Sequence, residues 1–305
     1  MTASRPPVSQ RQNDPDMLTL LRAAFSSHTR GQRLETARVA VSVALAAAGL
    51  LAAFVDQAAT PVAIAGGAWA AIYLAGIFPW ARAEARRGAV VQEMFDTELF
   101  GLPWKLTAAG PPLPPHEISK LAGKFTPSRG RGERLHDWYV DTSGVPQPYD
   151  IFICQEQNLG WDARLRKRWA TTLLVLVVAW TLLGVLIGYV AGLSVGDTLL
   201  RWYVPAATAI LLGVEGYKSH RDIAAERERI IPILQTEIDS AKRPPLPAKE
   251  QQRLSGIARE IQDVIFATRQ EAVRVPQWFY AHFCDDDERD FQSNADQLRE
   301  RLIRV

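Results

Sequence analysis

Two uncharged stretches of the chain constrain its fold more than any other feature. Residues 58–80 are 23 consecutive residues without a charged side chain, and residues 169–193 are 25. A helix needs about 20 predominantly apolar residues to cross the hydrocarbon core of a bilayer, and the core helices of soluble proteins rarely run this long without a charge. Both stretches therefore predict transmembrane helices.

Two shorter apolar stretches accompany them. Residues 39–55 carry no charge over 17 residues, and residues 199–214 carry only Arg201, near their start. An arginine near the end of a span can extend to the polar interface, where Trp and Tyr are also enriched. We therefore expect an all-α membrane protein with four transmembrane helices arranged as two hairpins.

The cations predict which segments face the cytosol. Of the 35 Lys and Arg residues, six lie in residues 1–38, thirteen in 81–168 and fifteen in 215–305. Lys and Arg close to the ends of membrane spans are enriched on the cytosolic side. We expect a multi-pass protein with both termini in the cytosol and almost no external loops. The 38 residues before the first span are too long and too polar for the start of a cleaved signal peptide.

These patterns divide the chain into five segments. They are a cytosolic N-terminal helix (1–38), a first transmembrane hairpin (39–80), a cytosolic middle segment (81–168), a second transmembrane hairpin (169–214) and a cytosolic C-terminal helical segment (215–305). Each cytosolic segment alone is too small for a good core, so we expect the three to form one mainly helical domain.

Local patterns predict helices over most of the cytosolic residues. The expected helices are 14–38, 81–100, 116–124, 215–240, 248–274 and 285–305; residues 135–150 should be irregular and PQWFY (276–280) a turn. The acidic run CDDDERD (284–290) would then lie in the first turn of the last helix, where carboxylates favour the helix macrodipole. We prefer this interpretation to a metal site.

Small residues recur every four positions in two of the spans. Gly184, Gly188 and Gly192 mark one face of the third span, and Gly67 and Ala71 mark one face of the second. Such faces let helix backbones approach closely in a membrane. Two interpretations stay open: an interface between subunits, or packing inside one four-helix bundle. No ionisable residue lies mid-span, which disfavours an ion or proton transporter.

No catalytic signature is present in the sequence. The chain lacks a P-loop, GxSxG, HExxH and a dinucleotide fingerprint, its five histidines show no ligand spacing, and its two cysteines fit a reducing cytosol. We therefore expect no enzyme, no cofactor and no bound metal.

A mixture of aromatic, amide and cationic residues remains as the candidate binding site. Aromatic faces stack on bases, Arg pairs with phosphates, and amides hydrogen-bond to base edges. Such a mixture suits a small nucleotide, although each aromatic alone is also consistent with a core or anchoring role. The candidate ligand-binding residues are Trp138, Tyr139, Gln155, Asn158, Trp161 and Arg164.

Five separated motifs carry a resemblance to a known family. They are RQNDPDMLTLLRAA (11–24), FDTELFGLPWK (95–105), HDWYVDTSGVP (136–146), ICQEQNLGWDARLRKRW (153–169) and PQWFY (276–280). In this order, over nearly the whole chain, they resemble the SMODS-associating four-transmembrane effector family. The chain departs from the family pattern at Lys105, where Asn is frequent, at Gly160, where a second Trp is frequent, and around Ala163.

The resemblance implies a role in CBASS, a bacterial anti-phage signalling system. A partner nucleotidyltransferase would make a cyclic di- or oligonucleotide, and the effector would bind it, oligomerise or rearrange, and permeabilise the inner membrane. The ligand would be this second messenger, and no DNA or RNA polymer is expected as a partner. The alternatives are a membrane-anchored adaptor without pore activity and a membrane enzyme with an unrecognised site.

Overall fold

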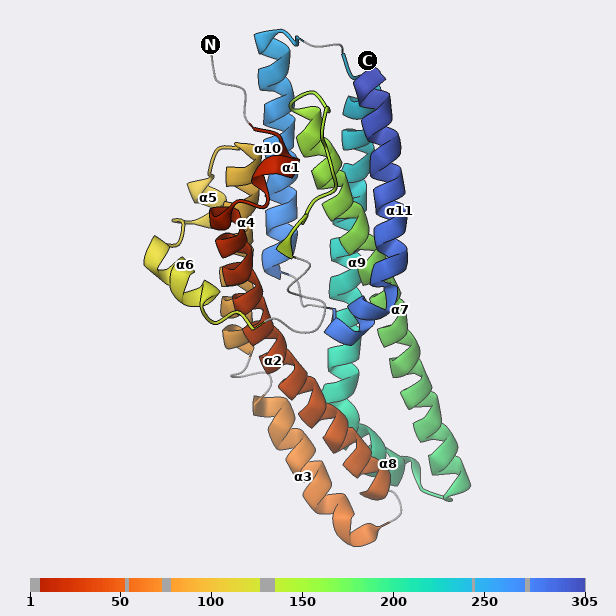
Figure 1. The fold of residues 1–305 in the computed structure, drawn as a ribbon. Helices are drawn as coiled ribbons and strands as arrows, with labels where there is room; N and C mark the ends of the chain where they lie inside the picture. Colours follow the sequence, from red (N-terminus) through yellow and green to blue (C-terminus); the bar gives the residue numbers. More distant parts are fainter. Residues whose placement is uncertain are drawn as a thin grey trace. The chain divides into compact units, whose positions relative to one another are not determined.

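The computed structural model describes residues 6–52, 55–72, 78–126, 135–242, 245–271 and 275–304, and no strand occurs within these ranges (Figure 1). The helices are α1 (Val8–Arg11), α2 (Pro15–Ala52), α3 (Asp56–Ile72), α4 (Phe78–Phe100), α5 (Leu106–Ala109), α6 (Pro115–Ala122), α7 (Tyr149–Val190), α8 (Val195–Thr198), the π-helical turn η3 (Leu199–Tyr203), α9 (Val204–Asp239), α10 (Ala248–Glu271) and α11 (Gln277–Arg304). The all-α prediction is therefore confirmed for the described part of the chain.

Most predicted helices appear with small changes at their ends. Helix α2 begins one residue after the predicted start and continues to Ala52, so the N-terminal helix and the described part of the first predicted span are one helix. Residues 53–54 and 73–77, within the first two predicted spans, and 272–274, at the end of the predicted helix 248–274, lie outside the described residues. Residues 135–148 contain no α-helix or strand, as the turn-rich sequence predicts.

The predicted turn at 276–280 is wrong. Helix α11 already begins at Gln277, and the N–H groups of Phe279 and Tyr280 donate to the carbonyl of Pro276. Proline is well suited to the start of a helix, because its missing N–H is not needed there. The acidic run at 284–290 consequently lies inside the helix and not in its first turn, so the macrodipole explanation of this run is also wrong.

The chain divides into two compact units. Unit 1 comprises Met1–Thr29, Glu84–Arg166 and Asp222–Val305, and unit 2 comprises Arg30–Ala83 and Lys167–Arg221. Unit 1 has an apolar core to which most of its helices contribute. Its most buried members include Met17 and Leu21 of α2, Phe95 and Leu99 of α4, Phe152 of α7, Leu234 of α9, Ile265 of α10 and Leu302 of α11.

Two side chains at the N-terminus hold the irregular segment before α7. Gln12 donates from Nε2 to the carbonyl of Tyr139 at 3.1 Å, and its Oε1 accepts from the N–H of Tyr139 at 2.8 Å. Asn13 donates from Nδ2 to the Asp137 carboxylate at 2.8 Å, and its Oδ1 accepts from the N–H of Asp137 at 2.9 Å. The N–H and C=O groups of Tyr139 and the N–H of Asp137, which lie outside any α-helix or strand, thereby gain hydrogen-bond partners.

Unit 2 is packed through small residues. An added Cβ at Gly184 would lie 2.5 Å from the indole of Trp202, and one at Gly188 would lie 2.6 Å from the hydroxyl of Thr198. Gly49 and Gly66 likewise meet Pro205 of α9, each at 2.9 Å. At these positions the helices of this unit approach so closely that a side chain would not fit.

The outer surface of unit 2 is apolar. On α7 the large aliphatic side chains are mostly exposed, with Leu182 at 64%, Val185 at 60% and Val190 at 76%. Among the described helices, α7 is the one whose length and composition suffice to cross a membrane, and only 11% of its apolar window is buried. Continuous apolar surface of this kind is typical of contact with lipid or a partner protein. The count of four spans stays a prediction.

Candidate functional site

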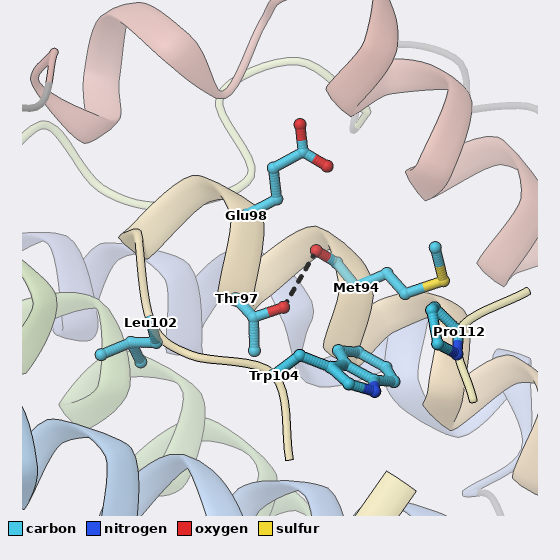
Figure 2. Close-up of a pocket in the computed structure, with 6 residues that line it drawn as sticks. All are labelled: Met94, Thr97, Glu98, Leu102, Trp104 and Pro112. Atoms are coloured by element: carbon cyan, nitrogen blue, oxygen red, sulfur yellow. Dashed lines mark hydrogen bonds between the residues drawn. The ribbon is translucent and has the colours of Figure 1, made fainter. Parts of the chain in front are cut away.

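One hollow opens on unit 1 beside the end of α4. It measures about 210 Å³ and is lined by Met94, Thr97, Glu98, Leu102, Trp104 and Pro112. Figure 2 shows the Trp104 indole between Thr97 and Pro112, and its Nε1 donates to the carbonyl of Gly110 at 2.9 Å. Pockets for drug-sized ligands measure about 300–1,000 Å³, so this hollow is too small for a cyclic dinucleotide. It contains none of the six candidate ligand-binding residues.

Those six residues separate into three places in unit 1. Trp138 packs its ring edge against Phe25, with ring centroids 5.5 Å apart and an interplanar angle of 82°. Tyr139 and Gln155 belong to a buried hydrogen-bond network. Asn158, Trp161 and Arg164 lie on α7, spaced three residues apart, and such a spacing places side chains on neighbouring positions of one helix surface. The six therefore do not form one site.

The buried network is centred on Asp96 of α4. Tyr139 donates from its hydroxyl to Asp96 at 2.7 Å, Gln262 of α10 donates to it at 2.9 Å, and Arg269 forms an ion pair with it. Gln155 joins through Gln262, at 3.3 Å, and also donates to the carbonyl of Ala258 at 2.8 Å. We call these groups, with Glu93 and Arg259, the Asp96 network.

Three groups of this network have a raised pKa, although burial acts differently on the acids and on the arginine. Desolvation, followed by the nearby charge of Asp96, raises the pKa of Glu93 and raises that of Tyr139 well above its usual value. For Arg269, desolvation is the largest single effect and acts to lower the pKa, but the charges of Asp96, Tyr139 and Glu93 and the hydrogen bond to Asp96 together raise it. Glu93 is held by Arg259 at 2.6 Å and Gln262 at 2.8 Å. The network is buried in unit 1 and exposes no face to a ligand, although Gln155 Oε1, Arg259 Nε and Arg269 Nη2 have no hydrogen-bond partner among the described residues.

The second cluster is built on α7 from the side chain of Trp161. Its indole stacks with the rings of Tyr280 and Phe291 of α11, at centroid distances of 6.2 and 6.0 Å and interplanar angles of 14° and 10°. The preceding residue, Gly160, permits this contact, because an added Cβ would lie 2.7 Å from the Phe291 ring. Offset stacking at such distances is favourable but leaves part of each ring face uncovered.

Arg164 lies one turn further along α7 and meets two carboxylates. Its Nη1 donates to Asp287 at 3.2 Å and to Asp290 at 2.8 Å, and its guanidinium carbon lies 4.7 Å from the Phe291 ring centroid. The Asp287 side chain is 1% exposed, whereas those of Arg164 and Asp290 are 39% and 67% exposed. The cation is therefore accessible from solvent although it is paired.

Asn158 completes the cluster through α9. Arg227 donates from Nη1 to the carbonyl and to the Oδ1 of Asn158, both at 3.3 Å. Asp162 pairs with Nε of Arg227 at 3.1 Å and with Nε of Arg166 at 2.5 Å. Burial, partly offset by Asp162, lowers the pKa of Arg227 to about 10. Two guanidinium groups on one carboxylate make this part of the cluster favourable for an anion.

We call this group of residues the α7 cluster; its members are Asn158, Gly160, Trp161, Asp162, Arg164, Arg166, Arg227, Tyr280, Asp287, Asp290 and Phe291. It combines stacked rings, guanidinium groups and an amide beside the apolar half of α7. Within the described ranges, no three His, Cys, Asp or Glu side chains form a group that could hold a metal ion.

Sequence reasoning found one side of this cluster and missed the other. It selected the α7 residues from their types, but it did not select Asp287, Asp290 or Phe291 of α11, or Arg227 of α9. The DxxD spacing of Asp287 and Asp290 was a usable signal, because residues three apart on a helix can meet the same cation. It was obscured by placing the start of that helix at residue 285.

The residues of the membrane-packing prediction have unequal surroundings in unit 2. Gly184 and Gly188 pack within the chain against Trp202 and Thr198, in agreement with the bundle-packing interpretation. Gly192 has φ +64° just after α7, and no atom lies within 4 Å of a Cβ added there or at Gly67. Ala71 is exposed. An intersubunit role for Gly67 and Ala71 stays a prediction.

Two positions where the chain departs from the family pattern have clear contacts. Lys105 forms an ion pair with Asp263, which also accepts from Arg259 at 2.9 Å. Gly160 provides the space into which Phe291 fits. Both departures therefore belong to packing within unit 1.

Comparisons with known proteins agree with this architecture. The family model of the SMODS-associating 4TM effector domain matches residues 6–298. A Bacillus cereus (strain VD146) protein described as a probable CBASS effector molecule is 22% identical over 294 residues, which cover 93% of this chain and 96% of the relative. No solved structure matches the chain. Since the family model covers nearly every residue, the chain belongs to the SMODS-associating 4TM effector family.

Proposed function

We propose that this chain is the membrane effector of a CBASS anti-phage system, activated by a cyclic di- or oligonucleotide. The observation that carries the proposal is the family match over residues 6–298, together with a relative, matched over 96% of its length, that is described as a probable CBASS effector. A partner synthase would make the second messenger on infection. Binding would then permeabilise the bacterial inner membrane and stop the infected cell.

The membrane part of the proposal rests on unit 2. The exposed aliphatic side chains of α7 are suited to contact with lipid tails in the bilayer core. Lipid tails are as apolar as these side chains, so exposing them to lipid costs no hydrophobic free energy. The cationic residues that flank the apolar stretches favour a multi-pass arrangement with both termini in the cytosol. Unit 1, which holds nearly all of the remaining cations, would then be the cytosolic sensor.

The ligand part rests on the α7 cluster. Trp161 offers an aromatic face for a base, Arg164 a half-exposed guanidinium for a phosphate, and Asn158 an amide for a base edge. Tyr139 and Gln155 are held in the Asp96 network, and we now assign them to structure and not to ligand contact. The proposed site is therefore narrower than the set of residues expected from the sequence.

Helix α7 is the element through which binding would act. It runs unbroken over 42 residues, from the buried Tyr149 through Trp161 and Arg164 to the exposed Val190 (Figure 1). A ligand shifts a conformational equilibrium only through its differential affinity for the two states. The cyclic nucleotide would favour the state in which α7 is displaced, and several copies would then assemble around an opening.

The test is dye release from liposomes that contain the purified chain, with a panel of cyclic di- and trinucleotides. Release with one member and not with the others is the expected result. Binding of one member without release would instead favour an adaptor that needs a further partner. Chromatography of the nucleotide after the assay should recover it intact, because we propose an effector that binds its signal and does not convert it.

Variants at the α7 cluster locate the site. Trp161→Ala and Arg164→Ala should each weaken binding of the active nucleotide by about tenfold or more, since stacking on one base contributes about 1–3 kcal/mol. Trp138→Ala is the matched control, because it removes an indole from unit 1 outside the cluster. If all three variants lose binding equally, the nucleotide site does not lie at the α7 cluster.

A further inference from the structure

We infer that α11 is a built-in occupant of the α7 cluster and that the cyclic nucleotide activates the protein by displacing it. This inference rests on the proposed function, and it assigns the regulation of the same site. It concerns the N-terminal half of α11, from Tyr280 to Phe291, and its contacts with α7.

The contacts made by α11 have the chemistry expected of the ligand. Tyr280 and Phe291 place their rings parallel to Trp161, as a stacked base would be. Asp287 and Asp290 place two carboxylates on Arg164, as a phosphodiester would place two oxygens. A nucleotide base cannot stack on Trp161 where the α11 rings lie, and its phosphate cannot pair with Arg164 where the α11 carboxylates lie. The helix and the ligand therefore compete for one set of groups.

The contact is specific to this pair of helices. At Gly160, α11 approaches α7 so closely that an added Cβ would lie 2.7 Å from the Phe291 ring. Cβ contacts below 3.0 Å essentially never occur, so any other residue at this position would displace the ring. The position of the Phe291 ring therefore depends on glycine at residue 160.

The outer ion pair of the contact, between Arg164 and Asp290, is weak enough to be replaced, whereas Asp287 is buried. Arg164 is 39% exposed and Asp290 67% exposed, and exposed ion pairs contribute little to stability. Further along α11, Arg299 donates to the carbonyl of Ser143 at 2.8 Å, and Ala295 and Leu302 are buried in the unit 1 core. The C-terminal half of α11 can therefore stay anchored while its N-terminal half leaves α7.

The first experiment compares Asp290→Asn with Asp296→Asn. Both change an exposed carboxylate of α11, but only Asp290 pairs with Arg164, whereas Asp296 accepts from Gln292 on its own helix. Binding is measured with fluorescent cyclic di-AMP, cyclic di-GMP and 3′,3′-cyclic GMP–AMP. Asp290→Asn should bind the active probe about two- to fivefold more tightly than the wild type, and Asp296→Asn should bind like the wild type.

A second pair of variants tests the close contact between Gly160 and Phe291. Gly160→Ala should displace Phe291 and lower the probe concentration that gives half-maximal dye release by about tenfold. Gly256→Ala is the control, because Gly256 also lies in a helix and no atom lies within 4 Å of its added Cβ. Hydrogen exchange should also become faster between residues 277 and 291 in Gly160→Ala and remain unchanged in Gly256→Ala.

The outcomes separate this inference from the proposed function. If the wild type binds a probe, and Asp290→Asn and Gly160→Ala bind it with the same affinity, the inference is overturned and the proposed function stays intact. If these two variants bind a probe and the wild type does not, the result supports both the inference and the proposed function. If no form of the protein bound any probe or released dye, the proposed function would fail and the inference with it.

Discussion

The two units bury different chemistry. Unit 1 encloses the ion pairs Glu93–Arg259 and Asp96–Arg269, in which each side chain is at most 8% exposed. Unit 2 has a packing centre in which the indoles of Trp180 and Trp202 stack at 4.7 Å, and Gly184 leaves room for the second of these rings. The interior of unit 1 combines an apolar core with fully buried ion pairs, and that of unit 2 depends on the fit of small and large residues.

The difference follows from the surroundings proposed for each unit. A unit in water gains stability from apolar burial, so it can accommodate charged pairs that fix a unique arrangement. In a bilayer the lipid is as apolar as the interior, and close packing is what remains to favour one arrangement. The comparison predicts that unit 1 should be sensitive to the loss of a charge and unit 2 to the gain of a methyl group.

The largest effect is expected for Asp96→Ala in unit 1. The substitution leaves Arg269 buried without its carboxylate and removes the acceptor of Tyr139 and Gln262. Breaking a buried pair costs about 3–5 kcal/mol, because the remaining charge is uncompensated. Denaturant titration of the detergent-solubilised protein measures the free energy of unfolding. A loss below about 1 kcal/mol would show that the network is dispensable. Asp296→Ala, at an exposed position, is the control.

The next effect tests unit 2 by adding a methyl group. Gly184→Ala should cost about 1–3 kcal/mol, because its Cβ would lie 2.5 Å from the Trp202 indole and overpacking forces strain. Gly67→Ala should be neutral or stabilising, since no atom lies within 4 Å and Ala favours a helix. Thermal unfolding in detergent compares the two. Equal loss in both variants would indicate that Gly67 is buried against another copy of the chain.

Sequence alone predicted the features that depend on one segment at a time. The apolar run at 169–193 indicated a membrane helix, because length and composition suffice for that inference. The sequence also indicated Trp161 and Arg164 as candidate ligand contacts, since an aromatic ring can stack on a base and a guanidinium can pair with a phosphate. The Asp96–Arg269 pair joins residues 173 positions apart on two helices, and no local pattern encodes such a contact.

The error at α11 has a local physical cause. Pro276 and the aromatic residues after it indicated a turn, and proline is in fact compatible with a helix start. Placing the helix start at residue 285 made the acidic run a capping feature, which concealed its contacts with Arg164. The α7 cluster was therefore predicted from one side, and the α11 contacts on which the proposed regulation rests became visible only in the structure.

A third prediction concerns the N-terminus of unit 1. Gln12→Ala should cost about 1–3 kcal/mol, because both backbone polar groups of the buried Tyr139 lose their partner. Asn13→Ala should cost less, since its two bonds to Asp137 are exposed to water. Denaturant titration ranks the pair, and the reverse order would contradict this account of how residues 135–148 are held.

The smallest effect is a pH dependence that should belong to unit 1. Desolvation raises the pKa of Glu156 in α7, although a hydrogen bond from Gln235, at 3.0 Å, acts to lower it. A carboxyl group whose pKa is raised on folding binds its proton more tightly in the folded state. Its contribution to stability is therefore complete below the unfolded value, 4.5, and is lost as the pH rises through the folded pKa.

Glu156→Gln replaces this carboxyl with a neutral group of the same shape and removes that pH dependence. Between pH 4.5 and 7.5 the free energy of unfolding of the variant should rise relative to the wild type, by at most about 1.4 kcal/mol per pH unit for one proton. Gly184→Ala should show the same difference from the wild type at every pH, because no proton is linked to the overpacked contact. A constant gap for Glu156→Gln would mean that water reaches this carboxylate, and that the interior of unit 1 is less dry around α7 than its buried charges imply.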